Sequence, residues 1–261
     1  MFDRPQVLLS RSNQALIALL AFATTSSGRR SCTQAFLTTS SANPILFTTK
    51  TPTRSYFSAT SPSSFNKKEL TTLAMTKKVL VPIADGSEEI ETTSITDTLT
   101  RFGAHVTVAS VMSGGRLECK MSRGITFRAD CSIDEAVQQE WDCVALPGGM
   151  PGAEHLRDCA PLIDLVKRQK ESGKWYGAIC AAPAVVLASH GLIDVGAAAT
   201  CYPAPQFREK LKHGSDDKVV VSKNLVTSQG PGTALLFALQ LGEEMFGKKE
   251  RDKVAAGLLV K

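Results

Sequence analysis

The sequence lacks the residue patterns that most metal and nucleotide sites require. Its seven cysteines form no C-x-x-C pair and have no metal-ligand spacing, and no glycine-rich phosphate-binding fingerprint appears. The chain also has few histidines: His105, His155, His190 and His213. These absences argue against a zinc module, a disulfide framework and a phosphate-cradling loop.

An excess of basic over acidic residues is absent from most of the chain. The formal net charge is +5, but residues 1–75 hold 8 Lys or Arg and 2 Asp or Glu, whereas the remainder holds 22 and 23. The part after residue 75 therefore has a net charge of −1, which does not indicate a nucleic-acid-binding surface. A membrane-spanning run is also lacking, because the apolar residues 15–23 are too few to cross a bilayer.

Residues 1–75 have the composition of a disordered targeting leader. Of these residues, 24 are Ser or Thr, and such a composition cannot bury a core. The apolar residues 15–23 fit a signal peptide, and the basic Ser/Thr-rich stretch after them fits a transit peptide. We expect plastid import, with residues 34–36 as a candidate cleavage point by analogy with bipartite leaders. A mitochondrial presequence and an untargeted tail are the alternatives, and a start at Met75 would give a cytosolic form.

The most informative residue that is present is Cys180, in the segment WYGAICAAP at residues 175–183. It lies between a strand-like run and a helix-like run over residues 182–189, and Pro183 suits the first helical turn. Unpaired N–H groups at a helix N-terminus favour a thiolate over a thiol, so this position predicts a reactive cysteine. A buried structural cysteine is the alternative, because free cysteines are often buried.

Two further segments suggest groups that would assist such a nucleophile. Gly148 and Gly149 follow a strand-like run, and their backbone N–H groups could hold an oxyanion. An ordinary tight turn is the alternative for them. The segment GSEEIE at residues 86–91 follows another strand, with Ser87 as a candidate helix cap. Most acids in such a first turn are solvated, but Glu91 could point into a cleft as a general acid or base.

The part of the chain after residue 75 alternates between strand and helix patterns. Its strand–helix–strand units predict an α/β fold with a mainly parallel sheet sandwiched by helices, in a single domain over residues 76–261. In such a sheet the catalytic groups gather at the carboxyl ends of the strands, which is where Glu91, Gly148 and Cys180 all lie. The expected strands are 78–84, 105–110, 143–146 and 175–179, the hairpins 117–129 and 219–227, and the helices 88–102, 162–171, 182–189 and 234–246.

The three segments, taken in order, resemble the DJ-1/PfpI superfamily, and most closely its DJ-1 branch, which includes the Parkinson-disease-associated protein deglycase. The resemblance runs from about Lys77 to the C-terminus and includes TSQGPGT at residues 227–233. It implies a flavodoxin-like fold, similar to class I glutamine amidotransferases. It also implies that Cys180 is the nucleophile and redox-sensitive thiol and that Glu91 is a largely protonated proton shuttle. The implied oxyanion and substrate-binding residues are Gly148, Gly149, Ala181, Arg101 and Arg123.

One segment departs from the superfamily pattern. Many members have a histidine near the cysteine, in a Thr-His-Pro segment, where this chain has Thr200, Cys201, Tyr202 and Pro203. Tyr202 therefore takes the histidine position, and a Cys–His–acid triad is not expected. Cys201 is a possible resolving thiol, with a passive pocket-wall cysteine as the alternative. Ala181 stands where the peptidase branch has histidine, which argues against proteolysis.

The resemblance implies a cofactor-independent glyoxalase or deglycase. Its substrates would be methylglyoxal, glyoxal and the early adducts that these dicarbonyls form on proteins or nucleotides. No metal and no cofactor are implied, and the mature protein is expected to be a homodimer without a membrane segment. The alternative is an oxidative-stress sensor or holdase chaperone that uses Cys180, and a cysteine peptidase or amidase is the least favoured interpretation.

Overall fold

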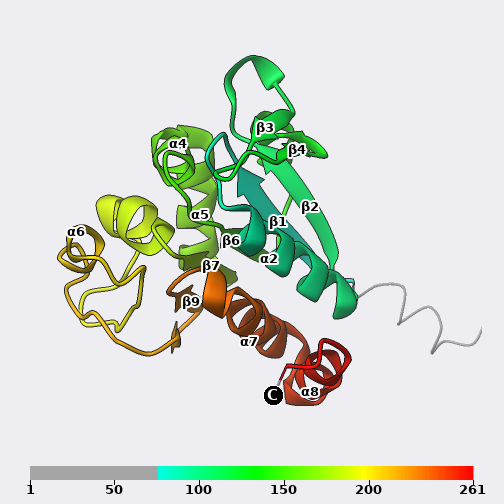
Figure 1. Cartoon of the computed structure of the whole chain (residues 1–261), viewed down its shortest axis with the longest axis vertical. Helices are drawn as coiled ribbons and strands as arrows, with labels where there is room; N and C mark the ends of the chain where they lie inside the picture. The colour runs from blue at the N-terminus through cyan, green and yellow to red at the C-terminus, as the bar shows by residue number, and fades with distance from the viewer. Residues whose placement is uncertain (1–75, 261) are drawn as a thin grey trace, which may run out of the picture. The chain divides into compact units, whose positions relative to one another are not determined.

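The computed structural model describes residues 76–260, and this part of the chain contains a seven-stranded sheet (Figure 1). The strands stand in the order β5-β2-β1-β6-β7-β9-β8, and every neighbouring pair is parallel except β8 with β9. The strands are β1 (Lys78–Ile83), β2 (His105–Ser110), β5 (Cys131–Ser132), β6 (Cys143–Leu146), β7 (Trp175–Ile179), β8 (Val219–Ser222) and β9 (Leu225–Ser228).

Helices flank this sheet on both faces. The chain moves in one direction from β1 to β2 and in the opposite direction from β6 to β7, so right-handed crossovers place α2 and α5 on opposite faces. The C-terminal α7 packs against α2 (Figure 1). The helices are α2 (Glu89–Arg101), α3 (Ile133–Ala136), α4 (Gly152–Asp158), α5 (Ala160–Ser172), α6 (Pro205–Arg208), α7 (Ala234–Phe246) and α8 (Lys248–Gly257).

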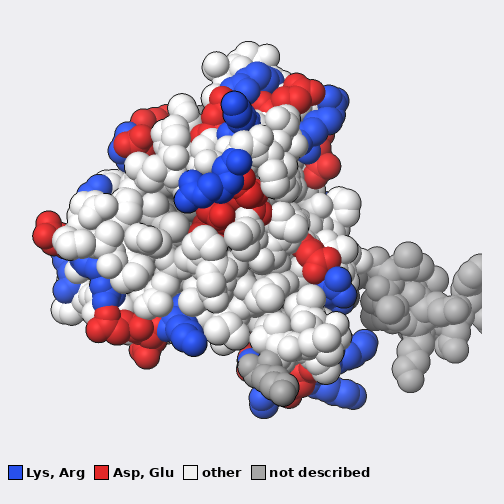
Figure 2. Space-filling view, viewed as in Figure 1, with Lys and Arg blue, Asp and Glu red and all other residues white. Residues whose placement is uncertain are grey.

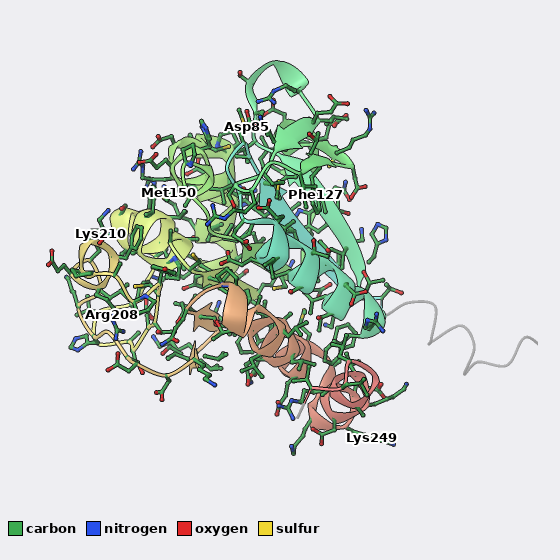
Figure 3. The ribbon with its side chains drawn as sticks, viewed as in Figure 1. Asp85, Phe127, Met150, Arg208, Lys210 and Lys249 are labelled. Carbon is green, nitrogen blue, oxygen red and sulfur yellow. The ribbon has the colours of Figure 1, made fainter. Side chains whose placement is uncertain are left out.

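Shorter elements complete the fold around the ends of the strands. An antiparallel hairpin of β3 (Glu118–Lys120) and β4 (Thr126–Arg128) forms a separate two-stranded sheet, as the sequence predicts. In Figure 3 this hairpin carries Phe127, which pairs in register with Cys119. The remaining elements are the single turns η1 (Ser113–Gly115), η2 (Pro183–Leu187), η3 (Ala188–His190) and η4 (Pro231–Thr233).

The core lies in the middle of this sandwich. Strand β6 is buried along its whole length, and β1 is buried from Val79 to Ile83, as expected for parallel strands covered on both faces. Where α2 meets α7, the ring of Phe102 lies so close to Gly242 that a Cβ there would come within 2.1 Å of it. Glycine is therefore required at this helix crossing, although it weakens a helix interior.

The predicted α/β fold and both predicted hairpins are confirmed. The segment after Cys180 differs from the expected α-helix over residues 182–189, because it forms the π-helical η2 followed by the 3₁₀ turn η3. A π-helical turn is an uncommon element that occurs frequently at functional sites.

The prediction of a targeting leader at residues 1–75 lies outside the described residues. Its plastid, mitochondrial and cytosolic alternatives therefore stay predictions. Among residues 76–260, no helix combines the length and the apolar character needed to cross a bilayer.

Candidate active site

The predicted site residues come together where the strand order reverses. Strands β1 and β6 are neighbours, and the chain leaves them in opposite directions, which is the topological switch point where α/β proteins place their ligands. Gly148, after β6, donates its N–H to Glu91 Oε2 at 2.7 Å, and Glu91 lies in the first turn of α2. A Cβ on Gly148 would stand 2.6 Å from the Cβ of Cys180, which follows β7. Three strand ends thus bring Glu91, Gly148 and Cys180 into contact range.

The backbone of Cys180 is strained. Its φ angle of 65° lies in the left-handed region, which side chains other than those of Gly, Asn and Asp rarely adopt. Hydrogen bonds on both sides hold this conformation: Cys180 N–H donates to Ser228 O at 3.0 Å, and Tyr202 N–H donates to Cys180 O at 2.8 Å. Strain of about 1–3 kcal/mol that the surroundings hold in place is characteristic of functional positions. No sequence pattern signalled this feature.

The thiol of Cys180 is less acidic than its predicted position at a helix N-terminus implies. Burial, together with the negative charge of Glu91, raises the pKa of Cys180 to about 12. The backbone N–H groups of Gly149 and Ala181 bind the sulfur and lower its pKa, but they do not offset burial. The helical segment that follows Cys180 is mostly π-helical and 3₁₀ rather than a regular α-helix. The raised pKa favours the thiol over the thiolate, so another group has to accept the Cys180 proton when the sulfur attacks a substrate.

Glu91 is placed to accept that proton. Its side chain is fully buried, and burial raises the pKa of Glu91 to about 7, while the N–H of Gly148 acts in the opposite direction. The charge of Glu88 raises the pKa of Glu91 as well, and the neighbouring Cys180 side chain lowers it. The raised pKa agrees in direction with the largely protonated carboxyl group that the resemblance implies. A pKa near the working pH suits a general acid–base group.

The other acids of the GSEEIE segment are not solvated, contrary to our expectation. Glu88 and Glu89 each keep only 5% of their surface exposed. Glu88, and not Ser87, caps α2: its Oε2 accepts the N–H of Glu91 at 2.8 Å, whereas Ser87 Oγ accepts the N–H of Ala84. Glu89 accepts hydrogen bonds from Ser122 Oγ and from the Arg123 N–H, both at 2.8 Å. Sequence analysis missed these roles, although three acids around one isoleucine were a visible signal.

The glycine loop performs two different tasks. The N–H of Gly148 is committed to Glu91, so the predicted oxyanion pocket consists of the N–H groups of Gly149 and Ala181. Gly149 has a φ of +86°, and a Cβ there would meet Gly86 O at 2.3 Å. Glycine is therefore needed at residue 149 both for its backbone conformation and for the close approach of the loop after β1.

The two predicted arginines lie in different places. Arg101 is in the last turn of α2, about 15 Å along the helix from Glu91, and it forms an ion pair with Asp97 at 2.7 Å. The structure does not bring Arg101 to the site, because a cation at that end of a helix interacts with the helix dipole and its i−4 partner instead. Arg123 lies in the β3–β4 turn, where its backbone bonds Glu89 beside the site.

Tyr202 and Cys201 border the site through the backbone. The N–H of Tyr202 supports Cys180 O, and its half-exposed ring packs edge-on against Phe207. Cys201 is fully buried, and its thiol donates to Tyr202 O at 3.4 Å. Burial raises the pKa of Cys201 to about 11. These features favour a pocket-wall cysteine over a resolving thiol.

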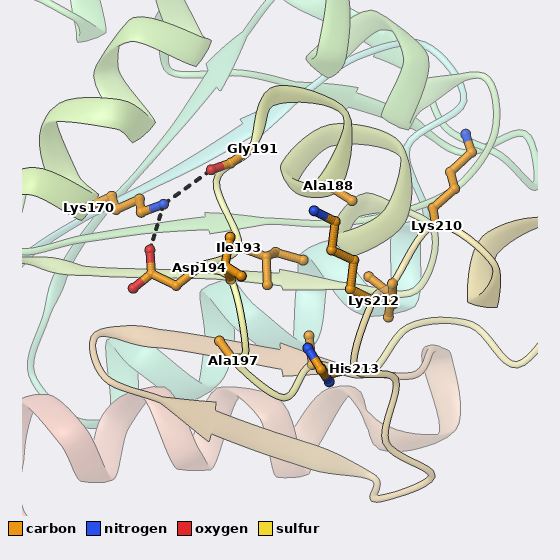
Figure 4. Close-up of a pocket in the computed structure, with 12 residues that line it drawn as sticks. Lys170, Ala188, Gly191, Ile193, Asp194, Ala197, Lys210, Lys212 and His213 are labelled. Carbon is orange, nitrogen blue, oxygen red and sulfur yellow. Dashed lines mark hydrogen bonds and ion pairs between the residues drawn. The ribbon is translucent and has the colours of Figure 1, made fainter.

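A separate cavity of about 270 Å³ is lined in part by Ala199 and Leu211, which pack against Cys201 (Figure 4). At its edge, Lys170 forms an ion pair with Asp194 at 2.8 Å and donates to Gly191 O. None of the predicted catalytic residues lines this cavity.

The surface and the titratable side chains provide two further observations. On the face drawn in Figure 2, Lys and Arg lie next to Asp and Glu in several small groups, and most of the face is uncharged. Within these residues, no three His, Cys, Asp or Glu side chains gather closely enough to hold a metal ion.

Comparison with known proteins assigns the family. The DJ-1/PfpI family model matches residues 77–244, which contain all the site residues described above. The chain belongs to the DJ-1/PfpI family. A solved structure of oxidized DJ-1 from Toxoplasma gondii is 46% identical, with a TM-score of 0.67, and the match covers 71% of this chain and 99% of that one.

Two curated DJ-1 relatives extend this comparison. Protein DJ-1 homolog B of Arabidopsis thaliana is 43% identical over 185 residues, which cover 71% of this chain but only 42% of the relative. The glutathione-independent glyoxalase DJR-1.2 of Caenorhabditis elegans is 35% identical over 181 residues, covering 67% of this chain and 91% of the relative. The chain thus matches less than half of the plant protein.

Proposed function

We propose that this protein is a cofactor-independent glyoxalase that converts methylglyoxal and glyoxal into hydroxy acids. The observation that carries the proposal is the strained Cys180 next to Glu91, a buried carboxyl group whose pKa is about 7. The glyoxalase name of the 35% identical relative supports the same chemistry. The test is the turnover of methylglyoxal by the purified protein without glutathione.

The first step joins the substrate to the enzyme. The Glu91 carboxylate accepts the proton of the Cys180 thiol, and the sulfur attacks the aldehyde carbon of the dicarbonyl. A C–S bond forms while the C=O π bond opens to an alkoxide. The N–H groups of Gly149 and Ala181 already point at the sulfur, so they are placed to hold this oxygen. Glu91 returns its proton to the alkoxide, which gives a hemithioacetal and restores the Glu91 carboxylate for the next step.

The second step is an internal oxidation and reduction that needs no external electron acceptor. Glu91 removes the proton from the former aldehyde carbon, and an enediol forms. Return of a proton to the neighbouring carbon reduces it to an alcohol and leaves the first carbon as a thioester. Water then breaks the C–S bond, which releases the hydroxy acid and restores the thiol. One group with a pKa near 7 can both accept and donate these protons.

The accessibility of Cys180 favours small substrates. Only 8% of its surface is exposed, which admits a three-carbon aldehyde more readily than a folded protein. Early adducts on proteins or nucleotides, the deglycase substrates, would have to place their hemiacetal carbon in this narrow opening. Proteolysis is disfavoured because Ala181 stands where a peptidase of this superfamily has histidine.

A redox sensor is the second candidate function. The solved Toxoplasma gondii relative is an oxidized protein. In this chain, Cys180 is the thiol whose oxidised form could receive hydrogen bonds from neighbouring groups. Gly149 and Ala181 would bind sulfinate oxygens through the N–H groups that bind the sulfur here, and a protonated Glu91 would donate to them. This function needs the same residues but no turnover of a dicarbonyl.

We expect Tyr202→Phe to retain most of the glyoxalase turnover. The structure gives Tyr202 a backbone role, since its N–H supports Cys180 O and its ring packs on Phe207. Phenylalanine preserves both features. Steady-state kinetics on methylglyoxal will test this, and a loss as large as that of Cys180→Ala would show that the phenol transfers protons.

We also propose a homodimer that forms through the α2 face around Ile90. Ile90 is 55% exposed, and Ile125, on the hairpin that contacts Glu89, is 56% exposed. Ile95, further along α2, is fully buried in the core and is not available for this contact. A two-fold contact here would place the Arg123 of one subunit near the pocket of the other.

Light scattering on the full chain is expected to give about twice the mass of one chain. Ile90→Asp, which buries a charge in the proposed contact, is expected to give monomers. The matched control is Val195→Asp, at an 88% exposed position outside this face, which should leave the dimer intact. A wild-type monomer at micromolar concentration would refute the proposed interface.

A further inference from the structure

A closed ring of hydrogen bonds joins Glu88 to both parts of the site. The Glu88 N–H donates to Gly148 O at 3.0 Å, the Gly148 N–H donates to Glu91 Oε2 at 2.7 Å, and the Glu91 N–H donates to Glu88 Oε2 at 2.8 Å. The ring connects the first turn of α2 to the loop that follows β6. Any movement of Glu88 therefore shifts the carboxyl group of Glu91 and the glycine loop together.

Glu88 also places a carboxylate in a buried position beside Glu91. Only 5% of Glu88 is exposed, and solvent therefore screens its charge weakly. Among the groups that face Glu91, Cys180 at the end of β7 is the other titratable one, and the loop after β6 contributes only the N–H of Gly148. The hairpin directs Arg123 to Glu89 and not to Glu91.

We propose that Glu88 is a positioning residue that sets the pH at which Glu91 exchanges its proton. It does so in two ways: its carboxylate disfavours a second negative charge on Glu91, and its cap fixes the helix turn from which Glu91 reaches Gly148. The direction follows from like-charge repulsion, because a negative charge on Glu88 disfavours the charged form of Glu91 and raises the pKa of Glu91. Glu88 keeps Glu91 able both to accept and to donate a proton at neutral pH. The effect of Glu88 on the titration of Glu91 does not depend on the proposed function. Only the expected effect on turnover rests on it.

The neighbouring Glu89 is a natural comparison. It lies in the same helical turn and is equally buried. Burial alone would raise the pKa of Glu89, but hydrogen bonds from Ser122 and Arg123 hold it below its usual range. Glu89 is not among the groups that shift the pKa of Glu91. Replacing either Glu88 or Glu89 by glutamine thus removes one buried charge from the same helical turn. Of the two, only Glu88 contacts Glu91, through the hydrogen bond from the Glu91 N–H.

The test is a pH titration of Glu91 in the full chain by carbon-13 NMR of labelled glutamate side chains. The signal missing from Glu91→Gln identifies Glu91. Glu88→Gln keeps an oxygen acceptor for the Glu91 N–H and removes the charge, and we expect the midpoint to fall by about one pH unit, the scale of a close like-charge interaction. Glu89→Gln should leave the midpoint in place. Glu88→Asp keeps a carboxylate and a favoured cap residue, and it should restore a midpoint near 7.

Two results would overturn the proposal: an unchanged midpoint in Glu88→Gln, or an equal shift in Glu89→Gln. If Glu88→Gln does not fold, the proposal still requires the wild-type midpoint in Glu88→Asp, and a shifted midpoint overturns it.

The titration needs no substrate. A wild type without turnover would therefore reject the glyoxalase function, while the role of Glu88 could still be tested. With turnover, the acidic limb of the pH–rate profile should move with the NMR midpoint. At pH 6, Glu88→Gln would then hold about five times more Glu91 carboxylate than the wild type.

Discussion

Replacing Cys180 with alanine is expected to reduce methylglyoxal turnover by about 10⁴-fold or more, the scale on which enzymes lose rate when their nucleophile is removed. Without the sulfur no hemithioacetal forms, and Glu91 has no bound carbon to deprotonate. The change leaves the fold in place, because Cys180 contributes a small side chain and alanine fits the same space. Steady-state kinetics with wild-type and variant protein will measure the loss.

The control for this experiment is Cys131→Ala. Cys131 lies in β5 at the edge strand of the sheet and is partly exposed, so it is at least as accessible to reagents as Cys180. Its loss should leave turnover within a factor of two of the wild type. Equal losses in both variants would show that the assay reports general thiol reactivity or damage to the fold rather than a nucleophile at residue 180.

Glu91→Gln is expected to lower turnover by about 10²-fold or more, the usual contribution of general acid–base catalysis. Glutamine can still accept the Gly148 N–H, so the glycine loop keeps its anchor. It cannot accept the Cys180 proton or carry one between the two substrate carbons. The loss should therefore appear in kcat more than in KM.

The pH–rate profile separates this role from a structural one. Burial raises the pKa of Glu91 to about 7, and the attack step needs the deprotonated carboxylate. Wild-type turnover should therefore fall as the pH decreases through about 7, and this limb should disappear in Glu91→Gln. A variant that keeps the same limb with unchanged turnover would remove Glu91 from the mechanism.

The sequence was sufficient to bring the main site residues together. Glu91, Gly148 and Cys180 each follow a strand-like run, and parallel strands bring their carboxyl ends to one edge of the sheet. That rule requires only the alternation of strands and helices, which is the strongest pattern after residue 75. The resemblance to the DJ-1/PfpI superfamily then assigned a role to each residue.

Other features depend on contacts between distant segments. The burial of Glu88 and Glu89 comes from the glycine loop and the β3–β4 hairpin, so the local sequence shows only an acidic first turn. The positive φ of Cys180 depends on bonds to Ser228 and Tyr202. Its raised pKa follows from the same packing, which outweighs the N–H groups that the sequence suggested.

Within one chain, Arg101 lies away from Glu91 and Cys180, so its predicted role at the site stays a prediction. Its position was taken from residues that line the approach to the site in related proteins. The helix geometry instead places it at the far end of α2, where Asp97 pairs with it. A residue carried over without a surrounding motif had no local pattern to support it, whereas Cys180 and the glycines lay inside continuous segments.

The most direct test of the account is proton NMR of methylglyoxal mixed with the purified full chain and no glutathione. With the wild type, we expect the aldehyde signal to decay while lactate accumulates in equal amount. With Cys180→Ala, we expect lactate to form no faster than in buffer without protein. If the wild type forms no lactate, or if Cys180→Ala forms it as fast, the glyoxalase proposal is wrong.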